Sequence, residues 1–131
     1  MLFLNAGCLP ATTIGPFADA TDADVEAIVN TNALHPIYLA RVLLPQMLKR
    51  NHKSALVVTS SIAAEQPIPH CLAYSCTKIF VSYLARGLSY ELDGQVDCID
   101  WLLGRVRTNM NKNASGPTCA TQEDSVHGIL K

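Results

Sequence analysis

Residues 55–61, Ala-Leu-Val-Val-Thr-Ser-Ser, decide the fold class of this chain. The first five are apolar or β-branched and lack the alternation of a half-exposed strand, which is typical of a parallel strand buried on both faces. Two hydroxyl side chains, Ser60 and Ser61, follow directly. Open α/β sheets place their ligand sites at the carboxyl ends of the strands. The stretch therefore predicts both a sheet and the edge where its chemistry lies.

Two further strands and three helices are expected around this stretch. The strand candidates are residues 2–4 and 96–103, and helical spacing of apolar residues covers about 21–50 and 71–92. A last helix should start at Thr121. Alternation of strands and helices implies parallel strands joined by right-handed crossovers, so the sequence predicts an α/β fold.

The helix boundaries follow from local signals. Thr21 is expected to cap the first helix, with Asp24 three residues later, and Pro36 and Pro45 should bend or interrupt it. Asp93-Gly94 should end the second helix. Residues 8–20 and the polar segment from 104 to 117 are expected to be loops.

Composition excludes several classes of function. The net charge of −1 argues against nucleic-acid or anionic-membrane partners. No apolar run is long enough to span a membrane, and no basic segment predicts a signal peptide. The five cysteines lack metal-site spacing, so we expect free, mostly buried thiols in a reducing compartment, and no metal site.

Tyr74 and Lys78 are four residues apart in a predicted helix and should share one face. A nearby ammonium favours a phenolate, which lowers the pKa of a tyrosine, and such a tyrosine can exchange a proton with an alcohol or carbonyl oxygen. The Ser61 hydroxyl is placed to bond that oxygen. The alternatives are an exposed helix pair and a turn or cap serine, and we prefer the turn or cap role for Ser60.

Four segments form a recognisable set by their order and spacing. They are Asn5-Ala6-Gly7, Thr31-Asn32-Ala33, Ser61 and Tyr74-Ser75-Cys76-Thr77-Lys78. Together they resemble the short-chain dehydrogenase/reductase family. The resemblance covers almost the whole chain and implies a Rossmann-like doubly wound sheet, a nicotinamide cofactor and hydride transfer between a carbonyl and an alcohol carbon. No segment matches the family's Gly-rich turn, and the chain opens on a central strand. Residues 1–131 are therefore expected to be the C-terminal, catalytic part of such a domain, without the first nucleotide-binding half.

The resemblance also implies a role for each matching residue. Tyr74 would be the acid/base, Lys78 would lower its pKa and hold the nicotinamide ribose, and Ser61 would orient the substrate oxygen. Asn32 would hold a water that links Lys78 to solvent. Leu103 stands where the family has a proline, beside the nicotinamide. The other residues implied to contact the cofactor are Asn5, Ala6, Gly7, Gly104, Val106 and Thr108.

Pro36 bears on Asn32 without reference to any family. In a regular helix the N–H of residue 36 would bond the carbonyl of Asn32, but proline has no N–H. The Asn32 carbonyl is thus free where the relay water is expected, although a plain kink is the alternative. We expect Pro36→Ala to slow the proton relay.

Within the family, Pro16-Phe17, residues 44–47 and Phe80-Val81 resemble the 3-oxoacyl-CoA reductase and 17-beta-hydroxysteroid dehydrogenase branch. This implies an acyl-CoA or steroid substrate in lipid metabolism and NADP as cofactor, with NAD as the alternative. It also implies the endoplasmic reticulum as location, with the cytoplasm as alternative, and a homodimer through the two long helices. A truncated, non-catalytic product that binds an intact relative is the competing function.

Three polar features remain. Asp97 and Asp100 are awkward in a buried strand, and Arg105 or Arg107 is expected to pair with one of them. His70 lies near the expected mouth of the site, where it is a candidate for substrate contact.

Overall fold

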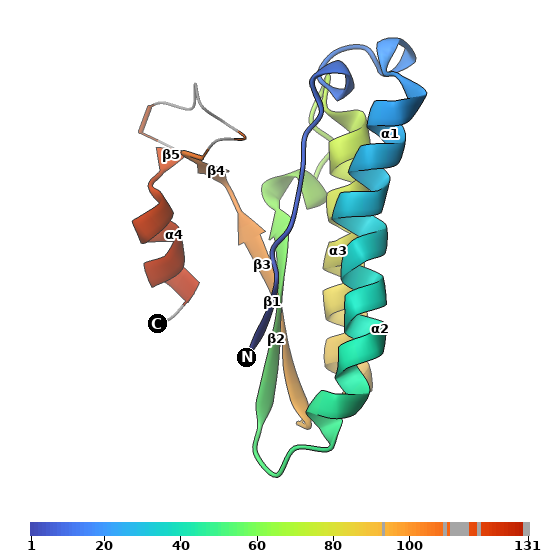
Figure 1. Cartoon of the computed structure of the whole chain (residues 1–131). Helices are drawn as coiled ribbons and strands as arrows, with labels where there is room; N and C mark the ends of the chain where they lie inside the picture. Colours follow the sequence, from blue (N-terminus) through green and yellow to red (C-terminus); the bar gives the residue numbers. More distant parts are fainter. Residues whose placement is uncertain (93, 109, 111–115, 118, 130–131) are drawn as a thin grey trace.

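The computed structural model describes residues 1–92, 94–108, 110, 116–117 and 119–129. Three parallel strands form its main sheet in the order β1-β2-β3, with the decisive stretch as the central strand. Helices α1, α2 and α3 lie on one face of this sheet and α4 lies on the other side (Figure 1). The predicted α/β fold is confirmed. The elements are β1 (Leu2–Leu4), η1 (Ala11–Thr13), η2 (Phe17–Asp19), α1 (Asp22–Val29), η3 (Asn30–Leu34), α2 (His35–Leu48), β2 (Ser54–Ser61), η4 (Ile62–Ala64), α3 (Leu72–Glu91), β3 (Val96–Leu103), β4 (Arg105–Val106), β5 (Cys119–Ala120) and α4 (Gln122–Ile129).

The core lies between the sheet and helices α2 and α3. Leu56 and Val58 of β2 are fully buried there, and each contributes roughly 1.5–3 kcal/mol of hydrophobic stabilisation. Ala40 on α2 and Ala85 on α3 are also buried in this cluster. Their small side chains let the helices lie close to the β-branched strand. This packing fixes α3 against the carboxyl half of β2, where the candidate site lies.

The predicted helix over residues 21–50 forms with an interruption. The Thr21 hydroxyl accepts the Asp24 N–H at 3.3 Å, which confirms the cap. Helix α1 then passes into a π-helical turn, η3, before α2 begins. Pro36 stands at the start of α2, so the expected interruption occurs there, whereas Pro45 lies inside α2 without ending it.

Several loop predictions need correction. The segment 8–20 contains the short 3-10 turns η1 and η2. After Gly104, β4 pairs in parallel with β5, so part of the expected loop is a two-stranded sheet. Helix α3 agrees with the predicted 71–92, and Gly94 follows it with a φ of +72°. Asp93 and the end of the predicted last helix lie outside the described residues.

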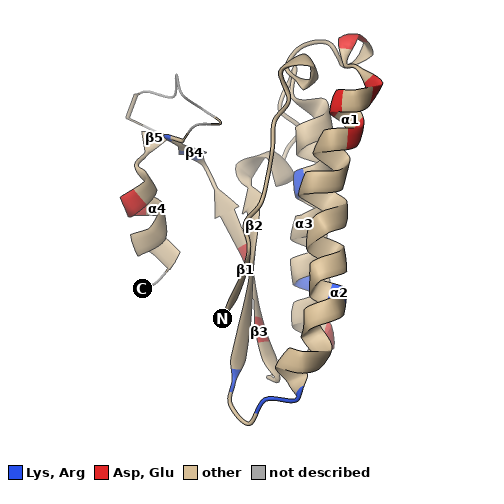
Figure 2. Ribbon diagram, in the orientation of Figure 1, with Lys and Arg blue, Asp and Glu red and all other residues tan. Residues whose placement is uncertain are grey.

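The predicted partners of the two strand aspartates are wrong. Asp97 pairs with Lys53 at 2.9 Å, and Asp100 contacts the Ser82 hydroxyl and, at 3.3 Å, Arg86. A strand advances about 3.3 Å per residue, so the arginines beyond the end of β3 lie far from both carboxylates. Figure 2 shows basic residues around the turn between α2 and β2 and acidic residues at the start of α1.

The cysteines are free thiols, but they are less buried than expected. Cys76 is exposed, and the other four are half-buried. The described residues contain no group of three or more His, Cys, Asp or Glu side chains that could hold a metal ion. None of the described helices combines the length and apolar character needed to cross a membrane.

Candidate active site

Strand β2 and helix α3 bring three of the predicted catalytic residues together. Ser61 is the last residue of β2, and Tyr74 and Lys78 lie one turn apart on α3. The Lys78 ammonium nitrogen lies 5.6 Å from the centroid of the Tyr74 ring. The Ser61 hydroxyl accepts the Ala63 N–H at 3.2 Å and is near enough to Tyr74 to act on its pKa. The expected shared face is confirmed. A hydroxyl pair therefore stands at the carboxyl edge of the sheet with a cation beside it.

Lys78 is a buried lysine, with only 5% of its surface exposed. Its Nζ donates to the backbone carbonyl of Thr59 at 2.9 Å, and the Ser60 hydroxyl donates to the Lys78 carbonyl at 3.1 Å. Burial lowers the pKa of Lys78 to about 8, against a smaller opposing effect of Cys8. Removing water disfavours the ammonium, yet at pH 7 most molecules keep it.

The pKa of Tyr74 is raised above its ordinary value, which is opposite in direction to the lowering expected from Lys78. Burial is the largest cause, the Ser61 hydroxyl acts in the opposite direction, and Cys71 adds a further increase. The effect of Lys78 itself on this pKa stays a prediction. The Lys78 ammonium donates to Thr59 and lies over the ring. Tyr74 is consequently a neutral phenol at pH 7, which is the form that donates a proton.

Asn32 is fully buried in the π-helical turn and acts as a clamp. Its Oδ1 accepts the Cys8 N–H at 2.8 Å, and its Nδ2 donates to the Cys8 carbonyl at 2.9 Å and to Thr77 Oγ1 at 3.3 Å. Both amide hydrogens are thus engaged, because a side-chain amide has two. The water relay predicted for Asn32 would use its main-chain carbonyl, and it stays a prediction.

Gly7 lies at the meeting point of this cluster. A Cβ built at Gly7 would come within 3.6 Å of Asn32 Oδ1, 3.8 Å of Lys78 Nζ and 3.9 Å of Met110 Cε. These are ordinary contact distances, so the loop after β1 runs directly beside the amide and the ammonium. The structure therefore places Gly7 together with the predicted catalytic residues.

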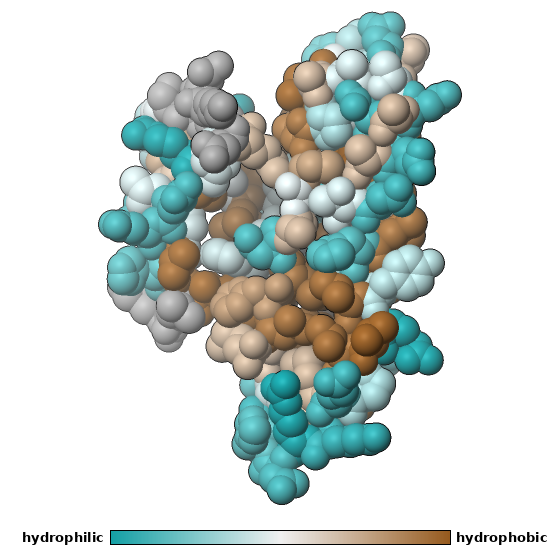
Figure 3. All heavy atoms as spheres, in the orientation of Figure 1, coloured by the Kyte–Doolittle hydropathy of each residue, from teal (hydrophilic) through white to brown (hydrophobic). Residues whose placement is uncertain are grey.

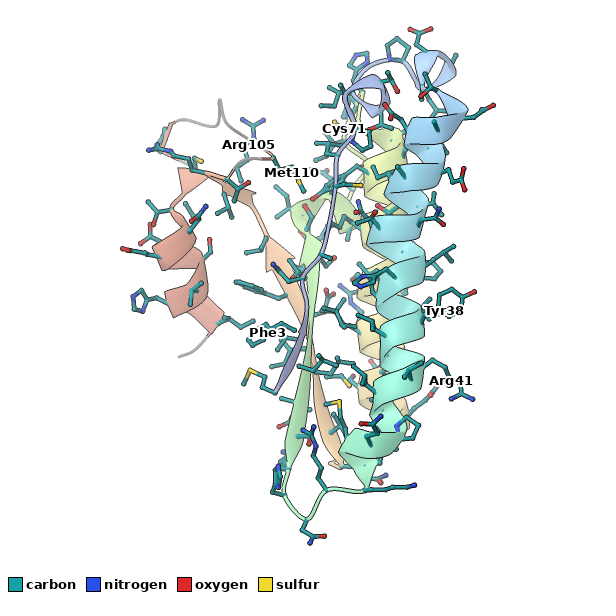
Figure 4. All side chains as sticks on the ribbon, in the orientation of Figure 1. Phe3, Tyr38, Arg41, Cys71, Arg105 and Met110 are labelled. Carbon is teal, nitrogen blue, oxygen red and sulfur yellow. The ribbon has the colours of Figure 1, made fainter. Side chains whose placement is uncertain are left out.

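Three other predicted cofactor residues line a separate hollow. Asn5, Val106 and Thr108 contribute to a cavity of about 470 Å³, which is otherwise mainly apolar. Phe3 extends from β1 toward α4 (Figure 4), and Figure 3 shows apolar atoms across the middle of this face. Ala6 and Gly104 are exposed and line neither cluster. The remaining lining residues are Phe3, Trp101, Leu103, Gln122, Ser125, Val126 and Ile129.

Thr59 connects the two clusters. Its hydroxyl donates to Asn5 Oδ1 at 2.8 Å, and its carbonyl accepts the Lys78 ammonium. One residue of β2 therefore contacts both the cavity wall and the Lys78 ammonium. No residue pattern singles out Thr59, because its contact with Lys78 is made by its backbone.

Comparison with known proteins identifies the family to which this fold and site belong. The family model for short chain dehydrogenases matches residues 1–117. The chain belongs to the short-chain dehydrogenase family. A solved structure of serine dehydrogenase complexed with NADP+ superposes on 98% of this chain and 57% of its own, with a TM-score of 0.86 and 25% identity.

Two curated relatives extend the comparison. The very-long-chain 3-oxoacyl-CoA reductase of Anas platyrhynchos is 36% identical over 77 residues, which are 57% of this chain and 24% of that protein. The NADPH-dependent 1-acyldihydroxyacetone phosphate reductase of Saccharomyces cerevisiae is 32% identical over 111 residues, 84% of this chain and 36% of that protein. The matched residues thus span less than half the length of these two curated relatives.

Sequence reasoning missed Ser60, Thr77 and Cys8 in this short-chain dehydrogenase site. Ser60 was expected to be a turn or cap residue, but it belongs to β2 and bonds α3. Alternation along β2 was the available signal, since it turns Ser60 to the helix-covered face shared by Leu56 and Val58. His70 is exposed with a φ of +62°, and its carbonyl accepts the Gly15 N–H at 2.8 Å. Its contact with substrate stays a prediction.

Proposed function

We propose that the chain supplies the proton-transfer residues of an NADP(H)-dependent oxidoreductase that interconverts a carbonyl and an alcohol. The neutral Tyr74 phenol, which lies with Ser61 and the Lys78 cation at the carboxyl end of β2, carries this proposal. A neutral phenol is the form that can give a proton to a carbonyl oxygen during reduction.

The roles of the chain's own residues follow from this arrangement. The Ser61 hydroxyl orients the substrate carbonyl oxygen, and Tyr74 Oη gives its proton to that oxygen as the carbonyl becomes an alcohol. Lys78 supports the negative charge left on Tyr74, because an ammonium stabilises a nearby phenolate. Solvent then returns a proton to Tyr74, with the Asn32 carbonyl as the proposed route.

The residues at the sheet edge fit the nicotinamide end of the cofactor. The cavity beside Asn5, Val106 and Thr108 has room for a flat ring system. Thr59 joins Asn5 in its wall to the Lys78 ammonium. When bound, the cofactor supplies the hydride. NADP is proposed over NAD because one relative is named as NADPH-dependent and the serine dehydrogenase structure holds NADP+.

The proposed substrate is an acyl chain that carries a carbonyl group, such as a 3-oxoacyl-CoA, with a steroid ketone as the second candidate. Support comes from the names of the Anas and Saccharomyces relatives, which both reduce acyl compounds. The first of these likenesses also motivates the endoplasmic reticulum as the proposed location. Competition between 3-oxoacyl-CoA and steroid ketones for the same preparation would distinguish the two substrate classes.

The direct test follows oxidation of NADPH by the chain with a 3-oxoacyl-CoA, compared with its Tyr74→Phe variant. Phenylalanine removes one oxygen atom and keeps the ring. Turnover should depend on the Tyr74 hydroxyl. Equal turnover by the two proteins would refute the proposed role of Tyr74.

A second candidate function is binding to a copy of the chain or to an intact relative through α2 and α3. Tyr38 on α2 and Tyr83 on α3 are each 66% exposed, and Val42 is also exposed. Tyr38 and Arg41 point from α2 away from the sheet (Figure 4). Apolar surface of this kind on neighbouring helices favours association.

The association test compares Val42→Asp with Phe17→Asp by molecular mass in solution. Both wild-type side chains are exposed, but Phe17 lies on η2 rather than on the long helices. Val42→Asp should lower the mass of an assembly and Phe17→Asp should leave it unchanged. A monomeric wild-type chain that also fails to bind an intact short-chain dehydrogenase would exclude this function.

A further inference from the structure

Two buried serine hydroxyls tie α3 to the sheet at different points. Ser60 of β2 is 1% exposed and donates to the backbone carbonyl of Lys78. Ser82 of α3 is 2% exposed and donates to the Asp100 carboxylate on β3. Both hydroxyls hold the helix against the sheet. The bond from Ser60, however, is made to the lysine of the candidate site itself.

Consecutive residues of β2 hold Lys78 at both ends. The Ser60 hydroxyl bonds its main-chain carbonyl, and the Thr59 carbonyl accepts its ammonium at 2.9 Å. The next residue, Ser61, ends the strand beside Tyr74 and acts on its pKa. A lysine side chain has four rotatable bonds and loses much rotamer freedom on burial. Anchoring both ends to one strand selects the few rotamers that keep the ammonium beside the tyrosine.

The ammonium has close neighbours on three sides. It bonds the Thr59 carbonyl at 2.9 Å, the Tyr74 ring centroid is 5.6 Å away, and the Gly7 backbone runs beside it. A small shift of the Lys78 backbone would therefore change the contact of its Nζ with the Thr59 carbonyl and with solvent. Both contacts govern how readily the lysine holds its proton.

We propose that Ser60 is a positioning residue, whose hydrogen bond to the Lys78 carbonyl sets the place of the Lys78 ammonium between Thr59 and Tyr74. Ser60 acts through Lys78 and donates to no other described group. The inference rests on the proposed function to the extent that Lys78 serves proton transfer there. Ser82, one turn further along α3, has no such part because its hydroxyl bonds Asp100.

The test compares Ser60→Ala with Ser82→Ala, since each variant removes one buried hydroxyl between α3 and the sheet. Titration of Lys78 by nitrogen-15 NMR gives its pKa, with Lys78→Arg to assign the signal. Ser60→Ala should raise the midpoint from about 8 by about half a unit or more toward the ordinary lysine value, as the ammonium gains solvent. Ser82→Ala should leave the midpoint in place while it lowers thermal stability.

An unchanged Lys78 midpoint in Ser60→Ala, or an equal shift in both variants, would overturn the proposal and leave Ser60 a structural staple. If Ser60→Ala does not fold, Ser60→Cys keeps the volume and a weak donor, and a smaller upward shift is expected. The titration uses the chain without substrate. Absence of carbonyl reduction would therefore refute the proposed function and leave the result on Ser60 standing.

Discussion

At the carboxyl edge of the sheet, the cluster around Lys78 is buried and hydrogen-bonded, whereas the cavity around Trp101 is open and mainly apolar. In the Lys78 cluster the buried polar side chains are hydrogen-bonded: Lys78 bonds Thr59, and Asn32 bonds Cys8. In the second, Phe3 and Val126 leave large parts of their surface exposed.

The difference shows where this chain determines its own geometry. The Lys78 cluster is defined by bonds among β2, α3 and η3, so a lost partner leaves a buried polar group unpaired. The cavity is defined by apolar side chains, which tolerate exchange for others of similar volume. Substitutions should therefore act sharply in the cluster and weakly in the cavity.

The largest expected effect is that of Tyr74→Phe on carbonyl reduction. General acid catalysis contributes about 10²–10⁴-fold to a rate, and a loss in that range is expected in kcat. Stability should change little, because the ring stays in place. Steady-state kinetics with thermal unfolding as control measures both. A Tyr74→Phe variant with an unchanged kcat would show that the Lys78 cluster does not supply the proton for carbonyl reduction.

The next effect is a rise of stability with pH, due to Lys78. Its folded pKa of about 8 lies below the unfolded value of 10.5. Between these values the unfolded chain binds more protons, so the free energy of unfolding rises from pH 8 toward 10, by up to about 3 kcal/mol. Above pH 10 the raised pKa of Tyr74 acts in the opposite sense.

Lys78→Met is the control for this pH dependence. It keeps an unbranched chain of similar length without a charge, so the rise between pH 8 and 10 should disappear. Urea unfolding at a series of pH values measures it. A rise of equal size in Lys78→Met would assign the effect to other groups.

Asn32→Ala should cost about 2–3 kcal/mol of stability. The substitution leaves the Cys8 N–H without its partner and frees Thr77 Oγ1, and an unsatisfied buried group costs about 1–3 kcal/mol. Denaturant unfolding gives the value. A loss below about 0.5 kcal/mol would show that water replaces the amide and that the clamp is weak.

Val126→Thr, on the cavity side, should have the smallest effect. Val126 is 49% exposed on α4, and surface substitutions of this kind usually stay within about 0.5 kcal/mol. Thermal unfolding of Val126→Thr and Asn32→Ala under the same conditions compares the two losses of stability. A loss as large as that of Asn32→Ala would mean that the cavity wall is as tightly determined as the cluster.

The sequence was sufficient for the three strands of the main sheet, for the long helices and for the pairing of Tyr74 with Lys78. Buried β-branched runs predicted the strands, and the four-residue spacing predicted the shared face. It could not give the direction of the Tyr74 pKa, because spacing fixes proximity and does not fix burial. Burial arises only when β2 and α3 pack together, and it is the largest influence on the Tyr74 pKa.

The partners of the strand residues show the same limit. The distance along β3 excludes Arg105 as a partner of Asp97. The register of β2 and β3 brings Lys53 near Asp97, and the packing of α3 on the sheet brings Arg86 near Asp100. The alternation of side chains along β2 was enough to predict that Ser60 faces the helices. Its acceptor, the carbonyl of Lys78, is a backbone group that no residue pattern identifies.

The most direct test of the central claim, that Tyr74 is a neutral proton donor in this site, is its pKa. Carbon-13 NMR of the tyrosine Cζ, with Tyr74→Phe to assign the signal, follows the titration in the intact chain. The structure predicts a midpoint above the ordinary value of 10.0. A midpoint below that value, approaching neutral pH, would contradict the account and restore Lys78 as the dominant influence on the phenol.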